Sequence, residues 1–158
     1  MQFGWASLCF CDYTFAMMTQ KLMKDPISHP KTNLIEQSLE HFAEHHGDPY
    51  KPAYDALYAR NEAYEGLFLL DTDEGLRRNM MRTTLEIITT YLSDHMAAAD
   101  RIVGARMSHI TYGIEADFDV FFEITRDIIA AGCAEIWTPA HLEAWTQMLA
   151  DFKSARLS

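Results

Sequence analysis

The chain has 158 residues, a formal net charge of −10 at pH 7, and 49% hydrophobic residues. This length predicts one domain whose core is large enough to form without disulfides or a structural metal. The negative charge disfavours nucleic acid and anionic membranes as partners, because phosphate contacts need clustered lysine and arginine. The three cysteines form neither a disulfide framework nor a zinc pattern, which fits the reducing cytoplasm.

Residues 1–32 are predicted to be an irregular N-terminal extension. The first eighteen residues are apolar but contain Asp12 and lack a basic start, so they fit neither a membrane-spanning helix nor a signal peptide. Two interpretations of this stretch remain, a true extension or a segment upstream of a later start codon at Met17 or Met18. If it is translated, it could pack against a second copy of the chain in a homodimer.

From residue 33 onward the periodicity is helical, with no convincing strand and no internal repeat. Asn33 with Glu36 predicts a capping box, Gly47 a helix end, and Thr138 followed by Pro139 another helix start. We expect a domain over 33–158 with six main helices and one short helical turn, at about 33–46, 49–61, 62–67 (the short turn), 74–93, 96–108, 117–132 and 138–152.

The longest predicted helix, 74–93, carries two adjacent apolar rows and should pack on more than one side. The acidic run before it, residues 71–74, supplies oxygens that can cap the helix and complement its dipole. The rows are Leu76, Met80, Thr84, Ile87 and Tyr91, and Met81, Leu85, Ile88 and Leu92.

The stretch 105–114 reads A-R-M-S-H-I-T-Y-G-I and places His109 at the end of a helix rich in small residues. Neutral imidazole is the commonest side-chain metal ligand, and a proximal histidine is one way in which proteins hold haem iron. A histidine at this position can equally be a capping or hydrogen-bonding residue, so the pattern needs support from the rest of the chain.

That support comes from two segments in register with the helix pattern. Residues 54–61 read Y-D-A-L-Y-A-R-N and lead to G-L-F at 66–68, which places Tyr54 and Phe68 at the spacing of a B-helix tyrosine and the phenylalanine that follows the C helix in globins. His109 is then followed by Y-G-I. Over residues 33–157 the chain resembles the globin family, specifically the bacterial single-domain globins and the haem domain of flavohaemoglobins. The resemblance implies an all-α globin fold around a haem pocket.

The resemblance also implies a site for haem b. His109 would bind the iron, with Ser108 or a carbonyl one turn earlier holding the other ring nitrogen. Phe68 would lie against the macrocycle, and Ile114 and Phe118 would contact it. Tyr54 would donate a hydrogen bond to bound O2.

On the distal side the sequence departs from the family pattern. The position that is often histidine or glutamine is Arg77, with Met81 one turn later facing the iron. Arg77 could reach a haem propionate or the bound gas, or it could be solvated like Arg78, and a shift of one residue in register would exchange the two. Met80 or Met81 could serve as a sixth iron ligand, although core packing is the commoner role of methionine.

The sequence predicts a protein that reversibly binds O2, or another diatomic gas, at five-coordinate iron. An alternative is NO dioxygenation, which would need a separate reductase, because the chain has no glycine-rich dinucleotide fingerprint. For that reason a binding function is favoured over an enzymatic one. A haemless globin-like module for signalling or protein interaction is the third alternative.

Overall fold

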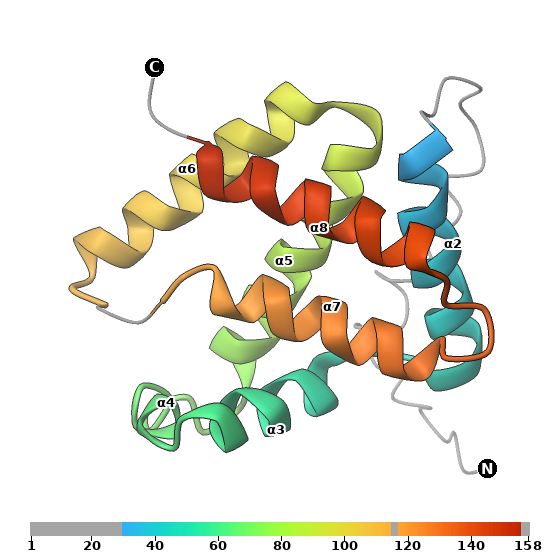
Figure 1. Cartoon of the computed structure of the whole chain (residues 1–158). Helices are drawn as coiled ribbons and strands as arrows, with labels where there is room; N and C mark the ends of the chain where they lie inside the picture. The colour runs from blue at the N-terminus through green and yellow to red at the C-terminus, as the bar shows by residue number, and fades with distance from the viewer. Residues whose placement is uncertain (1–29, 115–116, 156–158) are drawn as a thin grey trace, which may run out of the picture.

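A computed structural model describes residues 30–114 and 117–155, and within these ranges the protein is helical with no strand. This confirms the predicted all-α class and the expectation of six main helices and one short one (Figure 1). The predictions for residues 1–29 lie outside the described part. The helices are α2 (Pro30–His46), α3 (Tyr50–Arg60), α4 (Ala63–Gly66), α5 (Gly75–Ser93), α6 (His95–Thr111), α7 (Val120–Gly132) and α8 (Pro139–Ser154).

The start of α2 corrects the sequence prediction. The helix begins at Pro30, inside the predicted extension 1–32, and Asn33 therefore lies within the helix instead of capping it. Proline is accepted at a first helical position because the N–H that it lacks has no partner there. The predicted end is confirmed, since Gly47 adopts a φ of 73° and its N–H donates to the Ala43 carbonyl at 3.1 Å.

The ends of α6 are fixed by local hydrogen bonds. At the start, the Asp94 side chain accepts a hydrogen bond from the Ala97 N–H at 2.9 Å. At the end, Gly113 has a φ of 66° and donates its N–H to the Ile110 carbonyl at 3.0 Å. The helix is longer than the predicted 96–108, because the break at Tyr112 and Gly113 lets the last turn continue to Thr111.

The last two helices follow the predicted pattern. The predicted end of α7 near Gly132 is confirmed, but the helix starts at Val120, a few residues later than predicted. Thr138 and His141 form a reciprocal capping box at the start of α8, which confirms Thr138 as its N-cap.

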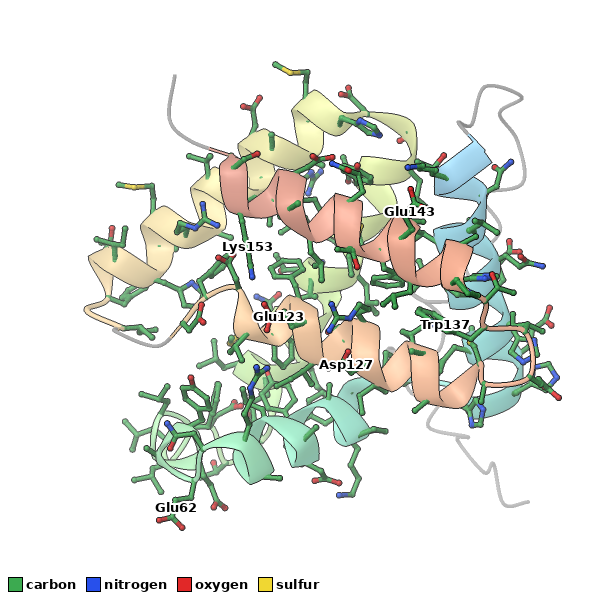
Figure 2. All side chains as sticks on the ribbon, in the orientation of Figure 1. Glu62, Glu123, Asp127, Trp137, Glu143 and Lys153 are labelled. Carbon is green, nitrogen blue, oxygen red and sulfur yellow. The ribbon has the colours of Figure 1, made fainter. Side chains whose placement is uncertain are left out.

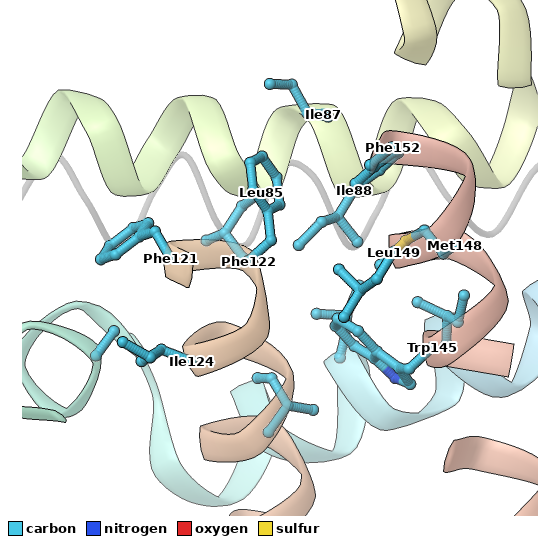
Figure 3. Packing of buried hydrophobic residues seen from close by; sticks show 14 of the residues in the cluster. Leu85, Ile87, Ile88, Phe121, Phe122, Ile124, Trp145, Met148, Leu149 and Phe152 are labelled. Atoms are coloured by element: carbon cyan, nitrogen blue, oxygen red, sulfur yellow. The ribbon is translucent and has the colours of Figure 1, made fainter. Parts of the chain in front are cut away.

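The core is formed by side chains from all the described helices except α4, and Figure 3 shows the part of it where residues of α5, α7 and α8 pack together. Trp145 on α8 is fully buried and donates its indole N–H to the Ser38 hydroxyl on α2 at 3.0 Å. The side chains labelled in Figure 3 are Leu85, Ile87 and Ile88 of α5, Phe121, Phe122 and Ile124 of α7, and Trp145, Met148, Leu149 and Phe152 of α8.

The helices are also joined at the surface. Lys153 of α8 reaches Glu123 of α7 at 2.6 Å, and Figure 2 shows the two side chains pointing toward one another. Glu123 also lies 3.4 Å from the guanidinium of Arg60 on α3. In the part of the chain that the structure describes, no helix combines the length and the apolar character that crossing a membrane requires.

Candidate functional site

His109 lies in the last turn of α6 with its ring held in a defined orientation. Its Nδ1 lies 2.9 Å from the Ala105 carbonyl, one turn earlier on the same helix. The ring also packs edge-on against Phe118, with centroids 5.0 Å apart. With Nδ1 protonated and donating to that carbonyl, Nε2 carries the lone pair, and it has no hydrogen-bond partner among the described residues.

This hydrogen bond distinguishes between the two predicted partners of the second His109 ring nitrogen, the Ser108 hydroxyl and a carbonyl one turn earlier. The Ser108 hydroxyl donates to the Gly104 carbonyl at 3.1 Å and is not bonded to the His109 ring. The carbonyl one turn earlier, that of Ala105, takes this role. Ile114 lies close to the same turn, since its N–H donates to the His109 carbonyl at 2.9 Å.

The C-terminal half of α6 has no fully buried side chain. The buried residues of this helix, Ala98 and Ile102, both lie in its N-terminal half. Figure 1 shows the C-terminal half extending past the end of α8 at the left of the view. The contacts that hold it include those of Arg106, which donates to the Ala155 carbonyl at 3.0 Å and to the Asp119 carboxylate at 2.9 Å.

Exposed apolar side chains are concentrated in two segments of the sequence. Of the nine large hydrophobic residues that are exposed in the described part, seven lie in the segments 67–76 and 107–112. Scattered exposed apolar residues are ordinary, whereas a contiguous exposed apolar patch is typical of surface that a ligand or partner covers. The seven are Leu67, Leu69, Leu70, Leu76, Met107, Ile110 and Tyr112.

Tyr54 on α3 is almost fully buried, with 3% of its surface exposed. Its hydroxyl donates a hydrogen bond to the main-chain carbonyl of Arg77 at 3.1 Å. A phenol keeps its proton at neutral pH at its ordinary pKa of about 10, and burial raises the pKa of Tyr54 further. Because that one proton is engaged, donation to another acceptor requires rotation of the hydroxyl away from the carbonyl.

Aromatic rings connect the predicted distal and proximal residues to the start of α7. Tyr54 packs edge-on against Phe68 with centroids 5.5 Å apart, and against Phe121 at 5.1 Å. On the other side, Phe118 packs against both His109 and Phe122. Both groups of rings therefore meet residues 118–122, which lead into and form the first turn of α7.

Arg77 is held by Asp71, with about 20% of its side chain exposed. Its Nε donates to the Asp71 carboxylate and its Nη2 to the Asp71 carbonyl, both at 2.9 Å. Arg78 pairs with Glu74 and lies over the ring of Tyr50. The pocket role of Arg77 stays a prediction, and it would require the guanidinium to release Asp71.

Asp71 also caps α5, which the acidic run before this helix indicated. Its carboxylate accepts hydrogen bonds from the N–H groups of Leu76 at 2.8 Å and Arg77 at 3.0 Å. Burial raises the pKa of Asp71, but these two N–H groups and the Arg77 guanidinium outweigh burial and lower it below the ordinary value. The carboxylate therefore fixes the end of α5 that carries the Arg77 carbonyl, to which Tyr54 is bonded.

The lowered pKa of Asp71 predicts a loss of stability in acid. The native state holds the charged form more tightly than the unfolded chain, so this contribution is present above the unfolded pKa of about 4 and falls as pH drops through the native value. In Asp71→Asn that part of the pH dependence should be absent. Urea unfolding of both proteins between pH 3 and pH 6 measures it.

Asp55→Asn is the matched control, since it removes an exposed carboxylate on α3 that pairs with Lys51. We expect its stability to follow pH as the unmodified protein does. Equal slopes of unfolding free energy against pH in all three proteins would contradict the role given to Asp71.

The two methionines of α5 differ in burial. Met81 has 2% of its surface exposed, and Met80 is half-buried. Both fit the packing role that the sequence favours for them, and the alternative role as a sixth iron ligand is untested.

Tyr58 is a candidate that the sequence did not single out. Its hydroxyl oxygen is buried with no partner of good hydrogen-bond geometry in the described ranges. The pKa of Arg77 is raised mainly by the Asp71 carboxylate. Tyr58, whose hydroxyl lies near the guanidinium, adds to this rise. A tyrosine four residues after Tyr54 shares its helix face, which was the available signal.

A separate pocket of about 440 Å³ is lined by residues of α2, α5 and α8 and by the start of α6, and none of the predicted site residues lines it. Its polar lining includes Tyr91, His95 and Asp151.

Comparisons with protein-family models, with curated proteins and with solved structures gave no match to this chain.

Proposed function

We propose that the protein is a globin that holds haem b through His109 and reversibly binds O2 or another diatomic gas. The observation that carries the proposal is the His109 ring, whose Nδ1 is held by the Ala105 carbonyl while Nε2 has no partner in the described part. Metal-ligating histidines almost always have their second nitrogen held in this way.

The surface around His109 fits a large apolar group. The last turns of α6 contain no fully buried side chain, and the exposed apolar residues of segments 67–76 and 107–112 belong to the elements that the resemblance places around haem. Covering apolar surface contributes roughly 25 cal/mol per Å². A flat apolar macrocycle would supply the contacts that this end of α6 lacks.

In the proposed site, haem would supply an iron that binds the gas. His109 would hold the iron, and Phe68 and Phe118 would pack on the ring. Tyr54 would be a neutral donor on the distal side, as any phenol is at neutral pH, and burial raises its pKa further. Asp71 keeps Arg77, and with it the first turns of α5, in place.

The visible absorption spectrum of the purified protein, expressed with haem supplied, tests the proposal. We expect a near-ultraviolet haem band and a five-coordinate ferrous spectrum that shifts when CO is added. Low-spin ferrous bands before any gas is added would point to Met80 or Met81 as an internal ligand. Absence of any haem band would overturn the proposal and leave a helical interaction module.

Replacing Tyr54 with phenylalanine should raise the O2 dissociation rate by about fivefold or more. A neutral hydrogen bond contributes about 1 kcal/mol, and more where the acceptor carries partial negative charge. Stopped-flow displacement of O2 by CO measures this rate.

Tyr58→Phe is the comparison variant, because Tyr58 is on the same helix and its buried hydroxyl has no partner of good geometry in the part described. Faster release in Tyr54→Phe alone supports the assignment. Faster O2 release in Tyr58→Phe alone would mean that Tyr58 donates the hydrogen bond to bound O2. The Tyr54 hydroxyl would then stay bonded to the Arg77 carbonyl.

A further inference from the structure

Two histidines and a glutamate gather at the end of α2. His41 and His45 are one turn apart on this helix, and Glu135 belongs to the connection between α7 and α8. One ligand atom from each residue lies within 4.8 Å of the other two. Figure 1 shows this end of α2 and the α7–α8 connection at the right of the view, whereas the end of α6 that carries His109 lies at the left.

The cluster has the features of a metal site that needs little rearrangement. The His41 Nε2 lies 3.1 Å from the Glu135 Oε1, but this nitrogen is buried and has no hydrogen bond of good geometry in the described part. The His45 Nδ1 lies 2.8 Å from the His41 carbonyl oxygen. When Nδ1 carries the proton and donates it to this oxygen, the lone pair of the neutral ring is on Nε2. The two rings are stacked with centroids 4.1 Å apart.

We propose that His41, His45 and Glu135 bind a divalent transition metal ion, with zinc as the best fit. Two imidazoles and one carboxylate with an open fourth position are a known zinc ligand set, and water would fill the fourth position. Ligand atoms about 2.0–2.1 Å from a tetrahedral ion lie about 3.3 Å apart. The His41–Glu135 pair has nearly that spacing already, and exposed His45 can move inward by side-chain rotation.

The ion would join segments that are far apart in the sequence. Close by, His46 lies 2.8 Å from the Gly132 carbonyl at the end of α7, so the two segments are already in contact. An ion that binds the folded chain alone stabilises it by mass action. Bound zinc would thus fasten the end of α2 to the α7–α8 connection.

Zinc titration of the full chain, stripped of metal with a chelator, tests the site by calorimetry and thermal unfolding. We expect one ion per chain and a Tm raised by about 5–10 °C when free zinc is 100 times Kd. His45→Ala and Glu135→Gln should each weaken zinc binding by more than about tenfold, the loss that even an indirect metal partner causes. Both side chains are exposed, so neither variant disturbs the core.

Two matched controls separate the site from other histidines and acids. His95→Ala removes an exposed histidine at the start of α6 that also stacks on a ring four residues earlier, that of Tyr91 at the end of α5. Glu44→Gln makes the same charge change on α2 outside the cluster. Zinc affinity unchanged in both controls and in His109→Ala supports the site, and it separates this proposal from that of haem binding.

The proposal is overturned if zinc does not bind or does not raise the Tm. It is equally overturned if His45→Ala binds zinc as the unmodified protein does, or if His95→Ala loses as much affinity as His45→Ala.

Discussion

Replacing His109 with alanine is expected to abolish stable haem retention. In the proposed site this imidazole is the protein's bond to the iron, and no fully buried side chain follows Ile102 in α6 to compensate for its loss. The ratio of haem absorbance to protein after gel filtration should therefore fall from about one haem per chain to near zero. Circular dichroism of the same fractions checks that the helices persist.

Ser108→Ala is the matched control for that experiment. Ser108 precedes His109, but its hydroxyl is bonded to the Gly104 carbonyl and not to the imidazole. Haem content should therefore be unchanged. His109→Gly supplied with free imidazole should regain haem, because the added ring can take the place of the missing one. Full haem content in His109→Ala would show that another residue holds the iron.

Trp145→Ala should produce the largest loss of stability among the core variants that we consider. Trp145 is fully buried where α8 packs against α2. Removing a large buried aromatic side chain costs about 3–5 kcal/mol, since apolar contacts are lost and a cavity remains. For a chain of this size the Tm should fall by about 6–20 °C. Urea unfolding followed by circular dichroism, at equal haem content, measures it.

The Ser38 hydroxyl allows the indole hydrogen bond to be measured separately. It accepts from Trp145 at 3.0 Å and donates to the Ile35 carbonyl at 2.7 Å. Ser38→Ala should cost about 1–3 kcal/mol, because it leaves the buried indole N–H without a partner. In a Trp145→Phe background the same change should cost less, and the difference gives the coupling energy. A loss below about 1 kcal/mol in Trp145→Ala would contradict this packing.

The helical pattern could be predicted from the sequence because it depends on local spacing. The apolar rows of α5 are confirmed as its buried face from Met81 to Leu92, whereas Leu76 in the first turn is exposed. Stops were predictable wherever glycine supplies a left-handed conformation, as at Gly47. The predicted start of α2 was wrong, because the pattern of asparagine followed three residues later by glutamate also occurs within helices, as Asn33 and Glu36 do here.

The predicted site could be placed on its helices but not arranged in detail. The sequence left open whether Ser108 or a carbonyl holds the His109 ring, and the structure gives the Ala105 carbonyl. It also left open which arginine faces the pocket, and the structure pairs Arg77 with Asp71 and Arg78 with Glu74. These choices depend on competing partners within one or two turns, which spacing alone does not rank.

For the described residues, the all-α class, the number of main helices and the position of His109 near a helix end could all be predicted from the sequence. These features follow from hydrophobic periodicity and from caps, which act over a few residues. Which distant groups meet depends on how the helices pack. Tyr54 donates to the Arg77 carbonyl, Trp145 to Ser38, and Glu135 lies against His41. Helices can pack in several ways with the same local pattern, and the complementary shapes of their buried faces select one of them.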